Sequence, residues 1–212
     1  MRNKSRCRIF RNIAELGLLL CLISSLLVPP AIANPQNDVE AKVQEAVNFI
    51  RNREISRGMA QLKELGSPAV PYVLDYVSRE AYRYPLIKIL LLNNFVSLTK
   101  GTEADAALIK FLADRQPELR GYAATELGER KVESAVPHIV LLLNDKANTT
   151  VIRDVNDHSP DVLVRDAAIG ALELIAGIKL AKGKSKEKQA KAWLSWWQKQ
   201  QRKMSAGMKS AI

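Results

Sequence analysis

Leu65-Gly66-Ser67-Pro68-Ala69-Val70-Pro71 is the stretch that decides the fold, because its pattern returns further along the chain. The second copy is Leu127-Gly128, a six-residue spacer and Ala135-Val136-Pro137. The two Ala-Val-Pro units begin at positions 69 and 135, a separation of 66 residues. Glycine is a common helix stop, and proline is tolerated in a first helical turn. A recurrence over about two periods of a helical repeat therefore indicates an array of helix pairs.

Apolar residues at helical spacing extend this array on both sides of the two motifs. The expected helices are 39–50, 55–65, a third from position 67, then 85–100, 102–113, 117–129, 132–143, 160–176 and 185–202. From position 85 onward they form consecutive pairs. The sequence therefore predicts an all-α chain, an α-solenoid of about four to five helix pairs.

The segment from Leu119 to Gly128, followed by Ala135-Val136-Pro137 and Leu141 to Asp145, resembles a bacterial HEAT repeat of the armadillo-like helical class. Val164 to Leu172 is similar to the start of another repeat, and Arg57 to Tyr76 is a looser copy. The resemblance covers most of 40–178. The resemblance says more about the fold than about the function, because the matching residues, Pro71 and Pro137 among them, are ones that pack neighbouring helices together.

In the HEAT family, an Asp and an Arg six positions later often form a ladder between repeats. Asp114 and Arg120 match that spacing, whereas Asp145 and Arg165 match it only if an insertion separates them. The resemblance therefore implies that these arginines are structural.

The first 33 residues have the layout of a secretory signal peptide. Five basic residues precede an apolar stretch from Leu16 to Val28, and Ala31-Ile32-Ala33 offers a small-x-small cleavage site. This stretch is shorter than the roughly 20 apolar residues that span a bilayer, and an uncleaved anchor is the alternative. We expect cleavage after Ala33, a periplasmic or secreted protein, and a short polar lead-in at 34–38.

Composition narrows the possible chemistry of the processed chain. Cys7 and Cys21 both lie in the leader, which excludes a disulfide scaffold, a zinc–thiolate site and a cysteine nucleophile. The net charge of +10 arises at the ends: residues 179–212 hold ten basic and one acidic residue, whereas residues 34–178 hold 17 basic and 20 acidic. A nucleic-acid-binding solenoid would carry positive charge along its face, so we expect no nucleic-acid partner.

One insertion, at 146–159, breaks the repeat rhythm. Its stretch 149–155 has β-propensity, so it forms either a short hairpin arm or a disordered loop. Insertions of a solenoid lie on one face, often the binding face, which makes Arg153 and Asp157 candidate partner contacts. A calcium loop starting at position 154 would need Gly and Glu where Ser159 and Arg165 stand, so we expect no metal site.

No catalytic motif stands out. The two histidines, His138 and His158, lie on different elements, and the chain has no glycine-rich phosphate loop and no Ser-His-Asp candidate. We therefore expect a protein that is not an enzyme and needs no cofactor.

The C-terminal segment 179–203 joins a basic linker to a helix with three tryptophans, Trp193, Trp196 and Trp197. As a terminal cap, these rings would cover the exposed apolar face of the last repeat. Alternatively, tryptophans beside many lysines have the composition of an interfacial helix drawn to anionic lipid. Lys188 and Lys191 are candidate partner contacts in this segment, and we expect residues 204–212 to be disordered.

Together these features predict an exported adaptor or scaffold for protein–protein interaction, built on a HEAT-like domain at 39–178. A rigid curved surface made by the second helices of successive pairs would bind an extended segment or a neighbouring domain of an unidentified protein. The alternative function is that of a peripheral membrane or polyanion-binding protein that uses the Lys- and Trp-rich C-terminal helix.

Overall fold

The computed structural model of the protein describes residues 35–80, 83–149 and 162–209. Within these ranges the secondary structure is helical apart from two strands of two residues each, which confirms the prediction of an all-α chain. The contacts divide the chain after Asp38, and the described residues from Val39 onward belong to one compact unit.

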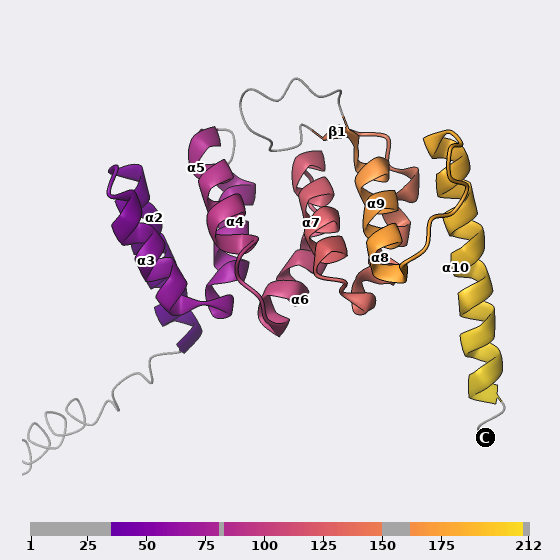
Figure 1. The fold of residues 1–212 in the computed structure, drawn as a ribbon. Coiled ribbons are helices and arrows are strands. Elements are labelled where there is room, and N and C mark those ends of the chain that lie inside the picture. The colour runs from indigo at the N-terminus through magenta and orange to yellow at the C-terminus, as the bar shows by residue number, and fades with distance from the viewer. Residues whose placement is uncertain (1–34, 81–82, 150–161, 210–212) are drawn as a thin grey trace, which may run out of the picture. The chain divides into compact units, whose positions relative to one another are not determined.

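The helices and strands follow one another along the chain (Figure 1). The α-helices are α2 (Pro35–Arg51), α3 (Ile55–Leu65), α4 (Val70–Glu80), α5 (Pro85–Leu91), α6 (Thr102–Phe111), α7 (Pro117–Glu129), α8 (Val136–Leu141), α9 (Val164–Ala176) and α10 (Lys186–Lys209). Short helical turns are η1 (Ser67–Ala69), η2 (Leu92–Val96), η3 (Glu133–Ala135) and η4 (Leu142–Asn144). Strands β1 (Asn148–Thr149) and β2 (Val162–Leu163) pair antiparallel, with Asn148 opposite Leu163.

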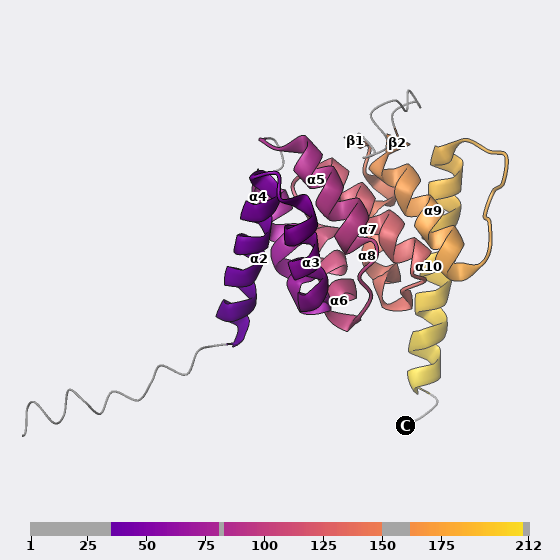
Figure 2. The same cartoon turned by 60° about the vertical axis from the view of Figure 1, so that its left-hand side comes forward.

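Within the unit that starts at Val39, the chain alternates between two layers of helices (Figures 1 and 2). In one layer α3 packs on η2 and α7 packs on α9, while in the other α4 packs on α6. Helix α10 contacts both layers, α9 more extensively than α8. Contacts of α4 with η2, α6 with α7 and α8 with α9 join the layers. Buried apolar side chains from Val43 of α2 to Trp193 of α10 form one continuous core.

The two copies of the recurring motif adopt the same local structure. In each copy, a three-residue 3-10 turn ends on a fully buried alanine, Ala69 or Ala135, and the next residue begins an α-helix. Pro71 and Pro137 both lie in the first turn of that helix, α4 or α8, where a missing N–H costs no hydrogen bond. Each copy of the motif therefore carries the chain from a helix of one layer to a helix of the other, from α3 to α4 or from α7 to α8.

Small residues let α7 and α9 approach each other closely. A Cβ atom placed on Gly128 of α7 would lie 2.6 Å from the Cα atom of Ala171 of α9. A Cβ atom placed on Gly58 of α3 would likewise come too close to the backbone carbonyl oxygen of Ala46 in α2. At these two crossings the helix spacing is set by the absence of a side chain.

Two boundaries near the ends of the described chain differ from the sequence-based expectations. Helix α2 begins at Pro35, inside the expected lead-in, since proline suits a first helical turn. Helix α10 continues to Lys209, into the tail expected to be disordered, and the Ser205 hydroxyl donates to the Gln201 carbonyl one turn earlier. Residues 150–161, which include Arg153 and Asp157 of the insertion, lie outside the described residues. Strand β1, at the start of the insertion, pairs with β2, which follows it.

Candidate functional site

The two arginines assigned a structural role both join successive elements. The Nε and Nη2 atoms of Arg120 lie 2.8 and 2.7 Å from the same oxygen, Oδ2 of Asp145, and Nη1 donates to the Asp114 backbone carbonyl at 2.8 Å. Arg165 donates to Asp166 at 3.2 Å and to Glu187, at the start of α10, at 2.7 Å. Each guanidinium thus ties a helix of the first layer to a later part of the chain.

The carboxylate of Asp114 has a different partner from the one that its spacing suggested. It accepts hydrogen bonds from the Ser78 hydroxyl at 2.7 Å and from the Gln116 backbone N–H at 2.8 Å. The six-residue spacing therefore places the Asp114 backbone carbonyl, rather than its carboxylate, against Arg120. The carboxylate in reach of Arg120 is that of Asp145, 25 positions further on.

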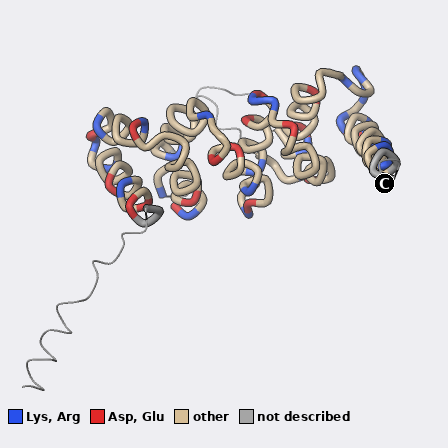
Figure 3. Tube along the Cα trace, turned by 90° about the horizontal axis from the view of Figure 1, so that it is seen from below, with Lys and Arg blue, Asp and Glu red and all other residues tan. Residues whose placement is uncertain are grey.

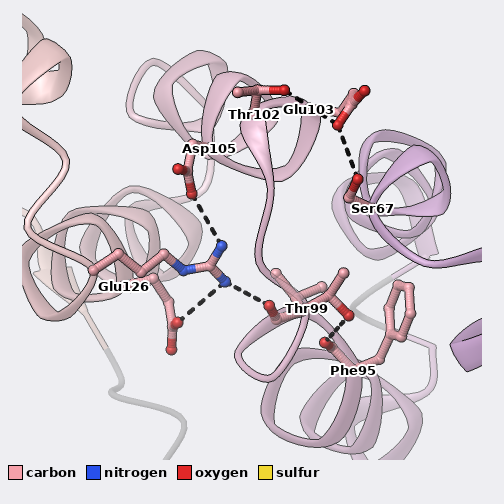
Figure 4. A network of polar contacts seen from close by, with 9 residues as sticks. Ser67, Phe95, Thr99, Thr102, Glu103, Asp105 and Glu126 are labelled. Carbon is pink, nitrogen blue, oxygen red and sulfur yellow. Dashed lines mark hydrogen bonds and ion pairs between the residues drawn. The ribbon is translucent and has the colours of Figure 1, made fainter.

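Sequence reasoning missed a buried polar network around Arg130 (Figure 4). The Arg130 guanidinium contacts Asp105 at 3.1 Å and Glu126 at 3.5 Å, and it donates to the Val96 carbonyl. Burial raises the pKa of Glu126, and the positive charge of Arg130 opposes that shift. The i,i+4 spacing of Glu126 and Arg130 was the available signal.

A groove of about 1060 Å³, here called the α4–α6 groove, lies along these two helices of the second layer. Its α4 wall is one helical stripe, and its α6 wall is another. The stripes comprise Pro71, Tyr72, Asp75 and Ser78 on α4, and Glu103, Ala106, Ala107, Lys110 and Phe111 on α6, while Glu40 of α2 adds an outer edge. The groove is open because the small side chains of Ala106 and Ala107 leave space between the larger side chains that line it.

The two ends of the α4–α6 groove carry different charges. At one end, Glu103 accepts a hydrogen bond from the Ser67 hydroxyl at 2.8 Å; bonds from its own backbone N–H and from Ser67 lower its pKa. The other end, beside Ser78 and Asp114, carries Lys110 and Arg115. Within the described residues, neither cation takes part in an ion pair, so both are available to a ligand.

A buried hydroxyl lies next to this groove. Tyr76 is 9% exposed, and its Oη atom has no hydrogen-bond partner among the described residues. It borders a hollow of about 20 Å³, which shares Glu40, Tyr72 and Asp75 with the groove and is large enough for one water molecule. Burial also raises the pKa of Tyr76, so the hydroxyl is a neutral donor.

A second groove of about 430 Å³ lies between α7 and α9 in the first layer. Four carboxylates line it, from Glu118, Glu126, Glu129 and Asp166, and no lysine or arginine of the described chain does. Thr149 and Val162 also line it, so the strand pair beside the insertion forms one border. This groove favours a cationic group.

Helix α10 packs on α9, η4 and α8. Trp193 is 0% exposed, whereas Trp196 and Trp197 are half-buried against the core. The Trp193 and Trp196 rings meet edge to face, with centroids 5.2 Å apart. Lys188 and Lys191 are exposed.

The described residues hold neither a metal-binding cluster nor a membrane-spanning helix. No three His, Cys, Asp or Glu side chains gather where they could hold a metal ion. None of the helices in these ranges has both the length and the apolar character needed to cross a bilayer. Among known proteins, no family model matches the chain, and no curated protein or solved structure matches it either.

Proposed function

We propose that this protein is an exported adaptor or scaffold, a HEAT-like α-solenoid that binds an extended segment of another protein and catalyses no reaction. The α4–α6 groove carries the proposal. It lies on helices of the second layer, where a repeat protein would present a continuous binding surface.

The size and chemistry of the groove favour a peptide over a small molecule. Its volume of about 1060 Å³ lies just above the roughly 300–1,000 Å³ typical of small-molecule pockets. Tyr72 and Phe111 offer apolar contact, while Lys110 and Arg115 offer charges without an internal partner. An extended segment can meet all of these groups along the length of two helices.

Two observations support the repeat architecture in this proposal. The two Ala-Val-Pro motifs form the same turn-and-helix unit, as one repeated element should. Arg120 also links its own helix to Asp145 of the following stretch, the type of contact that joins neighbouring repeats in the HEAT family. Export rests on the N-terminal leader, and sequencing of the mature N-terminus tests it: the expected first residue is Asn34.

A blocking variant tests the groove. Ala106 is exposed and lines it, so Ala106→Trp should fill the space without disturbing the core. Ala60→Trp is the matched control, because Ala60 is exposed on α3 and lines none of the grooves described above. A peptide selected from a random library against the wild-type protein should lose at least tenfold in affinity with Ala106→Trp and keep its affinity with Ala60→Trp.

A crosslinking experiment asks the same question in cells. A photoreactive residue at position 106 should give discrete crosslinked products that the same residue at position 60 does not give. Equal products from both positions, or library peptides that bind the two Trp variants equally well, would rule out the α4–α6 groove as the binding site.

A further inference from the structure

The outward face of α10 carries a stripe of positive charge that the adaptor function does not use. Lys188, Lys191, Lys199 and Arg202 are all exposed, and their spacing places them within about 80° of one another around the helix, opposite Trp193. We name these four residues the basic stripe. In Figure 3 the charged positions along α10 are predominantly blue.

The charge of the stripe is not neutralised within the described chain. Glu187 is the one acidic residue between positions 179 and 209, and it is already paired with Arg165 at 2.7 Å. No stripe residue takes part in an ion pair with the residues described here. The exposed lysines Lys182, Lys184 and Lys186 precede the stripe and add to the same positive charge.

The tryptophans of α10 are engaged in packing and are poorly placed for insertion into a membrane. Trp193 is fully buried, and Trp196 and Trp197 are half-buried against the core. This burial separates the lysines from the aromatic rings that an interfacial helix would insert. The binding chemistry of the outward face is therefore electrostatic.

From this geometry we infer that α10 adsorbs the protein onto an anionic lipid surface through the basic stripe, with no helix inserted. From Lys188 to Arg202 the helix rises over 14 residue steps, about 21 Å at 1.5 Å per residue, so a flat surface can touch all four cations at once. The remainder of the processed chain up to residue 178 has more acidic than basic residues, so an anionic surface would attract α10 in preference to it.

The expected strength follows from the attraction of basic residues to anionic membranes. Each Lys or Arg near such a surface improves binding by about fivefold, so the four stripe residues together contribute several-hundredfold. Added salt should weaken the attraction strongly, since the Debye length falls from about 10 Å at 0.1 M to about 3 Å at 1 M.

Co-sedimentation of the mature protein, purified after cells have removed the leader, with lipid vesicles tests this inference. Vesicles with about a third phosphatidylglycerol should bind it at 0.1 M salt, and pure phosphatidylcholine vesicles should not. The variant with Lys188→Gln, Lys191→Gln, Lys199→Gln and Arg202→Gln should bind several-hundredfold more weakly, with an unchanged melting temperature because all four side chains are exposed.

A matched control removes the same charge elsewhere, by Lys63→Gln, Lys100→Gln, Lys131→Gln and Lys146→Gln at four exposed positions outside α10. This control should change binding by less than about fivefold. The inference is overturned if the wild type ignores phosphatidylglycerol, if both quadruple variants weaken equally, or if neutral vesicles bind as well. Displacement from vesicles by a small excess of DNA would identify a nucleic acid as the preferred ligand and would also overturn it.

Discussion

Replacement of Gly128 by alanine should destabilise the protein, although alanine is the better helix former. A Cβ atom at this position would lie 2.6 Å from the Cα and 2.9 Å from the Cβ of Ala171. The nearest atom belongs to backbone, so a side-chain rotation brings no relief, and α7 and α9 must move apart. Ordinary van der Waals contact begins near 3.4 Å, which requires a shift of about 0.8 Å between two packed helices.

The magnitude follows from two opposing effects. Overpacking of this kind costs about 1–3 kcal/mol, and the gain in helix propensity from Gly to Ala is at most about 1 kcal/mol. Gly128→Ala should therefore lower the free energy of unfolding by about 1–2 kcal/mol. For a chain of this length, that loss corresponds to a fall in melting temperature of about 2–8 °C.

Gly170 provides the matched control, because it lies in α9 and a Cβ atom there would meet nothing within 4 Å. Gly170→Ala should raise the free energy of unfolding by about 0.5–1 kcal/mol through helix propensity alone. Urea denaturation followed by circular dichroism measures both variants. If Gly128→Ala is as stable as Gly170→Ala, the close approach of α7 and α9 is incorrect, and the reasoning fails.

Other substitutions probe the cap, the ladder and the buried carboxylate. Trp193→Ala should cost about 3–5 kcal/mol in urea unfolding, because this fully buried ring lies in the core beneath α10; a loss below 1 kcal/mol would contradict its capping role. Arg120→Met should lower the melting temperature by several degrees, since it leaves the partly buried Asp145 carboxylate unpaired, whereas replacement of the exposed Lys131 should leave it unchanged. Because the pKa of Glu126 is raised in the folded protein, its carboxyl group binds a proton more tightly in the folded than in the unfolded state. The protonated carboxyl therefore adds to the free energy of unfolding below the ordinary pKa of 4.5, and this stabilisation is lost as the pH rises through the folded-state pKa. The stability of Glu126→Gln relative to the wild type should accordingly rise from pH 4.5 to pH 7 in urea titrations, and a constant difference would refute the shift.

Local sequence was sufficient to predict most of the helices, including those at 55–65, 102–113 and 117–129. Their ends carry recognisable stops and starts, such as Gly66 and Pro117, which act through backbone geometry within a few residues. The C-terminal helix was predicted as far as about Arg202. Its continuation to Lys209 was missed because small and polar residues such as Ser205 are compatible with either helix or disorder.

The candidate sites were less accessible to sequence reasoning. The α4–α6 groove combines side chains from separated segments, and whether space stays open between Tyr72 and Phe111 depends on the packing of the two helices. The network of Arg130 with Asp105 and the Val96 carbonyl likewise joins residues 25 and 34 positions apart. Spacing along the chain does not identify such partners.

The sequence by itself determined the helical class of this chain, the two matching turn-and-helix motifs and the concentration of basic residues after position 178. Only the tertiary structure decided that Arg120 meets the carboxylate of Asp145, that Gly128 lies against Ala171, and that Trp193 is buried while Lys188 and Lys191 are exposed. The reason is physical: helix formation depends on neighbours within one or two turns, whereas burial and ion pairing depend on which distant helix faces each side chain.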